Sequence, residues 1–388
     1  MGAVSKVDDF QRRHSVVGFP LAVVYKYFDD QGPYLAAGLT YYAFVAIFPL
    51  MLLGTSILGF VLQDNPELQE QILNSALGQF PIIGDELGRP QGIQGSLTGA
   101  VLGALTALYG CQGLGQALQN LQHTAWSVPR NSRPNPIYAR VKTLLLLVTA
   151  GMSLMTVSVL TTVGTTTDLF SGALEGWFRT LVLPMIGVLV VGAFLSLLFR
   201  FAATGQHSFW RAAPGGFTLA LMWQGLQILG ASYVEHVLVD TSSMAKTFGL
   251  VLGLIGFLWI GATMAVFATE INVVLGRRLW PRALLTPFTD RVHLTQADRR
   301  AYASYVRMQR LKGYEQVEVV WKDGPDWEAD LSGTVLSEVG DPGTGAVDGD
   351  LPGQDALPAD DRPSQDPAHL GLAARATSEG GSQPSRDR

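Results

Sequence analysis

Cysteine is nearly absent from the sequence, and so are the local motifs of soluble enzymes. Cys111 is the only cysteine, which excludes an intrachain disulfide and a multi-cysteine metal site. The six histidines are scattered, with no two at the spacing of metal ligands, and no HExxH, Walker A or GxSxG motif occurs. We therefore expect no cofactor and no metal, and we expect that the protein is not an enzyme.

Charge is also scarce, and what there is does not favour a nucleic-acid partner. Charged residues make up 15% of the chain and the formal net charge is −5, whereas nucleic-acid binding needs many Lys and Arg to neutralise phosphates. The hydrophobic residues are concentrated before about residue 285. Residues 330–388 are mostly Gly, Pro, Asp and Ser, so they cannot bury enough apolar surface to fold, and we predict a disordered tail.

Long apolar runs without charge are the main positive feature of the sequence. A helix needs about 20 apolar residues to cross the roughly 30 Å hydrocarbon core of a bilayer, where its backbone must satisfy its own hydrogen bonds. Six stretches meet this requirement, at about 35–62, 97–118, 143–167, 180–199, 212–234 and 247–269. The sequence therefore predicts an all-α membrane protein, a six-transmembrane-helix bundle within residues 31–280. Pro49 and Pro184 lie inside two of these spans and predict a bend or hinge.

The segments on either side of the bundle are predicted to be cytoplasmic. Residues 1–30 contain an apolar stretch, 15–25, that is too short to span and is predicted to be an interfacial helix. No secretory signal is evident, so the first span itself is expected to direct insertion. Residues 281–329 form a predicted helical segment, with a helix over 296–312 begun by Thr295 as N-cap. Its arginines suit either the anionic inner leaflet or plain solvent.

The distribution of Lys and Arg orients the bundle. The N-terminal segment, the second and fourth loops and the segment after the last span are rich in Lys and Arg. The first, third and fifth loops hold one basic residue each, namely Arg89, Arg179 and Lys246. Because basic residues collect on the cytoplasmic side, both termini are predicted to be cytoplasmic. We expect a multi-pass protein of the bacterial inner (plasma) membrane.

Several motifs resemble the YihY/BrkB membrane proteins, a family once labelled ribonuclease BN. They are residues 35–44 (LAAGLTYYAF), Phe48-Pro49-Leu50, Trp223 with Tyr233-Val234, Phe248-Gly249, and residues 268–272 (ATEIN). The resemblance covers roughly residues 20–280. The chain departs from the family's usual Tyr-Gly at residues 248–249, from its Gly-Ala at residues 268–269, and from the Pro it often has after the fourth span.

The resemblance implies a six-helix inner-membrane protein for which transport, lipid movement and serum resistance have been proposed. The sequence gives the ribonuclease label no support.

Glu270 is the strongest candidate for a functional side chain. It is the only carboxylate that closely follows the apolar run of the last span, and Asn272 lies two residues beyond it. An ionisable group at membrane depth is costly, which makes it a default candidate for function. Two interpretations stay open. Glu270 either caps polar groups or pairs with Arg277 or Arg200, or it forms a proton or cation site at the inner mouth of a cavity.

Other polar and small residues recur one helical turn apart inside the spans. Amide pairs either bond between helices or line a polar route, and tyrosines near the inner end of the first span are either interfacial or cavity residues. Glycine pairs permit close helix packing. The residues are Gln112, Gln116, Gln224 and Gln227 for the amides, Tyr41 and Tyr42 for the tyrosines, and Gly99, Gly103, Gly249 and Gly253 for the glycines.

Three functions follow from these features. The favoured one is a transporter or flippase for a lipid or amphipathic small molecule, although no inverted repeat is evident. The alternative is a membrane scaffold that binds partners through its cytoplasmic C-terminal region. An intramembrane enzyme is favoured least, because no catalytic constellation is present. The lipid bilayer is the one partner that the sequence indicates, with a lipid or small amphipathic molecule as the possible substrate.

Overall fold

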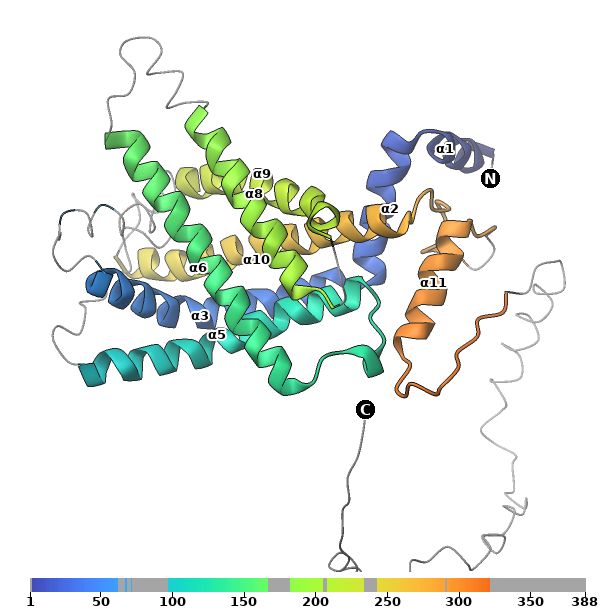
Figure 1. Ribbon diagram of the computed structural model, residues 1–388. Helices are drawn as coiled ribbons and strands as arrows, with labels where there is room; N and C mark the ends of the chain where they lie inside the picture. Colours follow the sequence, from blue (N-terminus) through green and yellow to red (C-terminus); the bar gives the residue numbers. More distant parts are fainter. Residues whose placement is uncertain are drawn as a thin grey trace, which may run out of the picture. The chain divides into compact units, whose positions relative to one another are not determined.

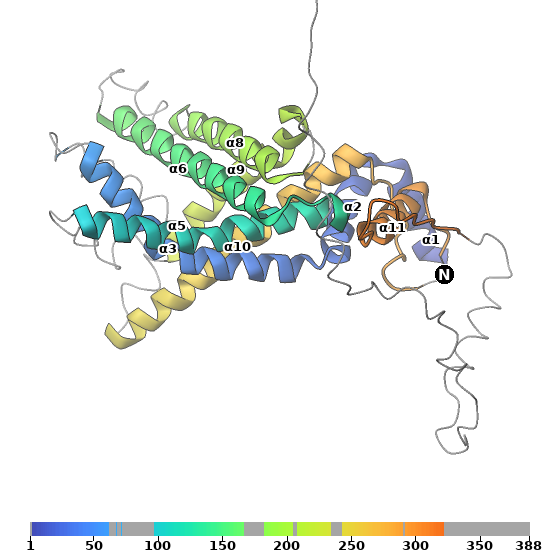
Figure 2. The ribbon, with the colours of Figure 1, turned by 60° about the horizontal axis from the view of Figure 1, so that its bottom comes forward.

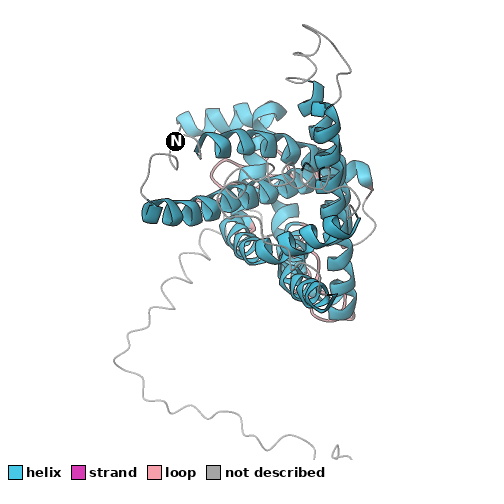
Figure 3. Cartoon of the chain, turned by 90° about the vertical axis from the view of Figure 1, so that its left-hand side faces the viewer, coloured by secondary structure: helices cyan, strands magenta, loops and turns pink. Residues whose placement is uncertain are grey.

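The protein is helical throughout the part of the chain that the structure describes. The computed structural model describes residues 2–61, 67, 71, 97–166, 182–204, 208–233, 243–289 and 292–321. These residues form α-helices, a short 3-10 turn and connecting segments, with no strand among them (Figure 3). The all-α prediction is therefore confirmed. The chain divides into a helical unit, Met1–Trp321, and a second unit, Lys322–Arg388. The predicted disordered tail lies outside the described residues.

Each of the six predicted spans coincides with a helix. They are α3 (Gly32–Val61), α5 (Leu97–Ala125), α6 (Pro136–Thr166), α8 (Leu183–Ala202), α9 (Phe209–Tyr233) and α10 (Ser243–Arg277). Several helices run past the apolar stretch into polar sequence because the backbone hydrogen bonds continue there. Among the described residues, three segments are long and apolar enough to cross a membrane, namely Pro136–Leu160, Leu183–Ala202 and Phe248–Arg277, while Gly32–Ile47 is apolar but shorter.

The helix α10 is the central element of the unit. It packs against α9 and α3, against α5, and against a shorter N-terminal helix, α2 (Ser15–Asp29). On one side of it α6, α8 and α9 pack in sequence, and on another α3 packs against α5 (Figure 1, Figure 2). Residues at the end of α10 are therefore surrounded by several other helices, so a polar group there has its environment fixed by packing.

Two further helices join α2 at one end of this unit (Figure 1, Figure 2). The first, α1 (Gly2–Arg13), was not predicted from the sequence. The second, α11 (Gln296–Met308), begins with the predicted capping box, in which the Thr295 hydroxyl accepts from the Asp298 N–H and the Asp298 carboxylate accepts from the Thr295 N–H. A capping box satisfies two helix-end donors and fixes where a helix starts. The predicted N-cap is confirmed.

A small apolar core holds these terminal helices against the bundle. Val23 of α2, Ala125 of α5, Val274 of α10 and Ala301 of α11 belong to one buried cluster, with Phe19 and Trp280 packed against it. Because two of these residues are alanines, the backbones can approach closely. The cluster brings the N-terminal helix and the last helix together at the end of α10.

Candidate functional site

Glu270 lies in the last two turns of α10 and is completely removed from solvent. Its cationic partner comes from the opposite end of the chain. The Lys26 Nζ of α2 lies 3.6 Å from Oε2 of Glu270, and it also forms an ion pair with Asp30, four residues further on. All three side chains are 0% exposed. The structure thus pairs Glu270 with Lys26 rather than with either of the arginines that the sequence suggested.

Several oxygen atoms in this triad have no hydrogen-bond partner among the described residues. They are both carboxylate oxygens of Glu270 and the second carboxylate oxygen of Asp30. Three of the four carboxylate oxygens of the triad therefore lack a hydrogen bond, and burying an ionised group costs several kcal/mol unless it is paired and hydrogen-bonded. This arrangement stabilises the fold poorly.

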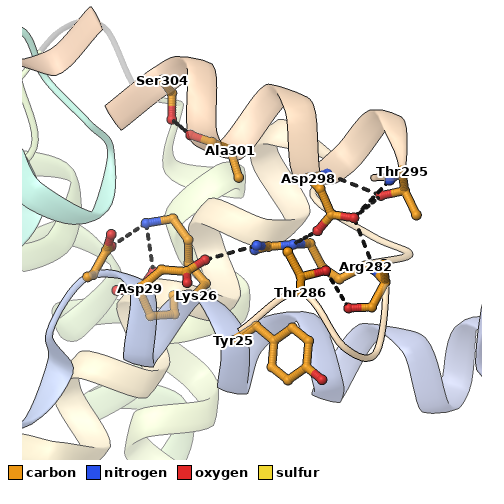
Figure 4. Close-up of polar contacts among 12 residues, drawn as sticks. Tyr25, Lys26, Asp29, Arg282, Thr286, Thr295, Asp298, Ala301 and Ser304 are labelled. Carbon is orange, nitrogen blue, oxygen red and sulfur yellow. Dashed lines mark hydrogen bonds and ion pairs between the residues drawn. The ribbon is translucent and has the colours of Figure 1, made fainter. Parts of the chain in front are cut away.

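A second buried ion pair continues the network. The guanidinium of Arg282, which follows α10, lies between Asp29 of α2 and Asp298 of α11 (Figure 4). Nη2 is 3.0 Å from the Asp29 carboxylate and Nε pairs with Asp298. Burial alone lowers the pKa of Arg282, but the two carboxylates outweigh it and raise the pKa above its ordinary value. Arg282 therefore stays charged and links both terminal helices.

Aromatic rings enclose these charges. The Lys26 ammonium lies 5.1 Å from the centroid of the Tyr305 ring, and the Arg282 guanidinium lies 5.4 Å from that of Tyr302. Cation–π contacts of this kind strengthen when they are desolvated. Burial, and next the charge of Asp30, raise the pKa of Tyr305, so its hydroxyl stays protonated. The rings of α11 thus cover the cluster and keep water from it.

We call Lys26, Asp29, Asp30, Glu270, Arg282 and Asp298 the buried ion cluster. If every group is ionised, its four carboxylates exceed the charge of Lys26 and Arg282, even when Arg277, which interacts electrostatically with Asp30, is added. One proton or one monovalent cation restores neutrality. In the described part of the chain no group of His, Cys, Asp or Glu has the arrangement of a metal site.

Asn272, the second candidate on α10, is a packing residue in this structure. Its amide donates to the carbonyl of Ala212 at 3.1 Å and its oxygen accepts from the N–H of Gly215 at 2.7 Å. These two bonds satisfy backbone groups in the first turns of α9, next to Pro214. Asn272 therefore joins α9 to α10 and is separate from the polar contacts of Glu270.

The predicted amide pairs and tyrosines do not gather around Glu270. Gln112, Gln224 and Gln227 are half-buried and Gln116 is exposed, while Tyr41 and Tyr42 are both exposed, at 63% and 40%. The buried amides of α5 lie further along the helix. Gln119 donates to the Thr143 hydroxyl at 2.8 Å and Gln122 to the Thr269 hydroxyl at 3.1 Å. Both residues bond between helices, and the sequence gave no reason to prefer them over the pairs before them.

The predicted packing and hinge residues are placed as follows. Gly249 and Gly253 are half-buried within α10, and the surroundings of Gly99, Gly103 and Pro49 lie outside what the structure describes. Pro184 is in the first turn of α8, where its missing N–H has no helical partner to lose, so no internal bend follows from it. Among the glycines that the structure describes, the closest approach to a backbone atom is at Gly215, where an added Cβ would lie 2.1 Å from the Ala268 carbonyl oxygen.

Sequence reasoning missed most of the buried ion cluster. Lys26, Asp29 and Asp30 were counted as part of a cytoplasmic segment, and Arg282 was counted as one of the basic residues after the last span. A usable signal was present, because Lys26 and Asp30 are spaced four residues apart on a helix that is otherwise apolar. Nothing local indicates that their partners come from the other end of the chain.

Comparison with known proteins agrees with the resemblance seen in the motifs. A family model described as Virulence factor BrkB matches residues 23–288. No curated protein and no solved structure gives a match. The matched range begins just before Lys26 and ends just after Arg282, so it includes five of the six residues of the buried ion cluster. The chain belongs to the BrkB family, membrane-type proteins built from apolar helices.

Proposed function

We propose that this protein is a transporter or flippase that moves a lipid or an amphipathic small molecule across the bacterial inner membrane. The observation that carries the proposal is the triad of Lys26, Asp30 and Glu270, fully buried at the end of the central helix, in which three carboxylate oxygens lack a hydrogen bond. Ionisable groups inside a membrane bundle are costly, and they are typical of ion and substrate pathways. A purely structural bundle would gain stability from apolar residues at these positions.

The triad suits a protein that alternates between two states. Lys26 comes from α2 and Glu270 from α10, so a relative shift of these two helices changes how well the charges compensate each other. A proton or a monovalent cation binds these carboxylates more strongly when the helices move so that Lys26 compensates them less. Binding of an ion and movement of the helices are therefore linked, as ion-coupled transport requires.

The proposal includes six membrane spans with both termini in the cytoplasm. Cysteine labelling tests this topology directly, because Cys111 is the one native cysteine and can be replaced by serine. In that background a cysteine at Lys246 is expected to react with an impermeant reagent from outside, and one at Arg140 is expected not to react until the membrane is opened. The reverse pattern would exclude the proposed orientation.

Reconstituted vesicles test the activity. The purified full chain is placed in vesicles containing headgroup-labelled lipids, and arrival of label in the other leaflet is followed by chemical quenching. Glu270→Gln keeps the size of the side chain and removes its charge, and we expect it to slow movement at least about tenfold, the loss typical of one positioned ionisable group. Glu318→Gln is the matched control, since Glu318 is an exposed carboxylate outside the cluster. Equal rates for wild type and both variants would remove the triad from the function.

A second candidate function is a membrane scaffold that uses the C-terminal region. The observation in its favour is that α11 is fixed to the bundle by Asp298 while it exposes Arg300 and Arg307 to solvent. Truncation after Lys322 leaves every residue of the buried ion cluster in place. Loss of function in that variant would favour the scaffold, whereas retained lipid movement would favour the transporter. We propose neither a catalytic reaction nor a nucleic-acid partner.

A further inference from the structure

The carboxylates of Glu270 and Asp30 face each other inside the buried ion cluster. Both side chains are 0% exposed, and they lie near enough to interact directly. Both oxygens of Glu270 and one oxygen of Asp30 have no hydrogen-bond partner among the described residues. Two ionised carboxylates are acceptors only, so they form no bond with each other and repel at short range. A proton between them would turn this repulsion into a hydrogen bond.

Lys26 does not remove the need for such a proton. Its ammonium forms an ion pair with Asp30, and it is 3.6 Å from the nearer oxygen of Glu270, which is beyond the length of a hydrogen bond. One cation thus faces two carboxylates. Arg277, further along α10, interacts electrostatically with Asp30, while its guanidinium donates to the carbonyl of Trp126. Glu270 is therefore the carboxylate of the triad with the weakest compensation.

The other two carboxylates of the buried ion cluster are bound as ionised groups. Asp298 accepts from the Arg282 guanidinium and from two backbone N–H groups. Asp29 accepts from Arg282 at 3.0 Å, and its side chain is 16% exposed, so it keeps some contact with water. Donors directed at a carboxylate favour its ionised form. The cluster is one positive charge short, and the proton that restores neutrality therefore belongs on Glu270.

The other helices packed against α10 carry few charged groups. α3 contains no Asp, Glu, Lys or Arg. The one histidine of α5, His123, forms a hydrogen bond outside the cluster, and the one arginine of α9, Arg211, is exposed. Tyr305 of α11 faces Glu270, but burial raises the pKa of Tyr305, so its neutral hydroxyl adds no charge. The charges that act on Glu270 thus come from α2 and its C-cap residue.

A proton suits this space better than a metal cation. A hard cation needs a shell of several oxygen ligands, whereas the unpartnered oxygens of the triad number three and come from two carboxylates. The Lys26 ammonium, 3.6 Å from Glu270, would also repel a second cation held there. A proton needs only one oxygen to carry it and one to accept from it, and it leaves the carboxyl group neutral.

We propose that Glu270 and Asp30 form a proton-binding site, in which Glu270 carries one proton and donates it in a hydrogen bond to the unpartnered oxygen of Asp30. Carboxyl pairs this close share a proton because they do not both ionise. Binding forms one O–H bond on Glu270 and removes one negative charge, and release of the proton to water reverses both changes. The inference rests on the proposed function, for which it names the coupling ion as a proton.

Infrared spectroscopy of the purified full-length protein in an ester-free detergent detects this proton without requiring transport. A protonated carboxyl group has a C=O stretching band that is separate from those of carboxylates and amides. At neutral pH we expect the wild type to show this band and Glu270→Gln to lack it. Cell-free synthesis with glutamate labelled with ¹³C in its side-chain carboxyl group should shift the band, and labelled aspartate should not. The labelling uses the wild type, so it carries the test if a variant misfolds.

Two further variants show whether the proton is shared. Glu318→Gln removes an exposed carboxylate and should leave the band unchanged. Asp30→Asn replaces a charged acceptor with a neutral one, so the hydrogen bond from Glu270 weakens and the band should move to higher frequency. Absence of the band from the wild type, or its persistence in Glu270→Gln, would overturn the proposal. An unchanged frequency in Asp30→Asn would overturn the sharing of the proton with Asp30.

The choice of salt tests the metal-cation alternative. The band should be equal in sodium, potassium and choline chloride at the same pH and ionic strength, and its loss in sodium or potassium would assign the site to a metal cation instead. Failure of the proton site is separable from failure of the proposed function. If the wild type shows no such band while lipid movement still requires Glu270, the proton site is refuted and the transporter stands. If the band is present while Glu270→Gln moves lipid normally, the proton site stands and the triad has no part in transport.

Discussion

Asp298 is the residue whose removal tests most directly how the terminal helices are held. Its carboxylate pairs with the buried Arg282 guanidinium and accepts from the N–H of Ala283 at 3.0 Å and from that of Thr295 at 2.9 Å. It therefore joins the start of α11 to the segment that follows α10. In Asp298→Ala all of these bonds are lost, and Asp29 is left as the one carboxylate that pairs with Arg282 among the described residues.

The magnitude follows from burial. Asp298 and Arg282 are both 0% exposed, so removal of the carboxylate leaves a buried cation half-compensated, which costs about 3–5 kcal/mol. α11 has no extensive contact with α3, α6, α8 or α9, so the loss is expected to be confined to the terminal helices. We expect local release of α11 from the bundle while the rest of the unit keeps its helices.

Hydrogen exchange read by mass spectrometry measures this release peptide by peptide. A loss of 3–5 kcal/mol raises the exchange of α11 amides by about a hundredfold to a few thousandfold, because each tenfold change corresponds to about 1.4 kcal/mol. Arg307→Ala on the exposed side of α11 is the control and should leave exchange unchanged. Protection of α11 in Asp298→Ala equal to wild type would refute the view that this ion pair docks the helix.

Three further predictions concern packing and pH. Gly215→Ala should lower the thermal unfolding temperature and cost about 1–3 kcal/mol, because its Cβ would collide with the Ala268 carbonyl. Gly225→Ala on the same helix meets open space and should be neutral or stabilising. A similar loss of stability in both variants would contradict the packing at Gly215. Asn272→Leu should cost about 2 kcal/mol in the same assay, because two backbone groups lose their partners. The pKa of His123 is lowered to about 4 in the folded state. The free energy of unfolding should therefore be highest above the ordinary histidine pKa of about 6.5, and it should fall as the pH drops towards 4. His123→Asn should flatten this dependence of the unfolding midpoint, and an identical slope in both proteins would count against a buried neutral histidine.

The helices could be predicted where the signal for them lies within a short stretch of sequence. The apolar run predicted at residues 180–199 corresponds to α8, Leu183–Ala202, and the pattern of Thr295 with Asp298 predicted the start of α11. Both signals depend on residues within one or two helical turns. α1 was missed because its mostly polar sequence offers no apolar run, and its contacts with α2 and with the segment after α10 are tertiary.

The candidate site was only partly predictable. Glu270 was identified because a carboxylate beside a long apolar run is conspicuous within that run alone. Lys26 is separated from it by most of the chain, and no periodicity reports a contact over that distance. Long-range pairing of charges is a property of the assembled bundle.

The residues of the buried ion cluster are synthesised at widely separated times. Lys26, Asp29 and Asp30 leave the ribosome long before Glu270, Arg282 and Asp298, which lie near the end of the helical unit. Until then Asp29 has no guanidinium beside it, and the N-terminal helix has only its internal Lys26–Asp30 pair. A chain interrupted before Arg282 thus leaves Asp29 without the guanidinium that it pairs with in the folded unit. The ion pair that ties α2 to the segment after α10 therefore forms only after nearly the whole helical unit has been made.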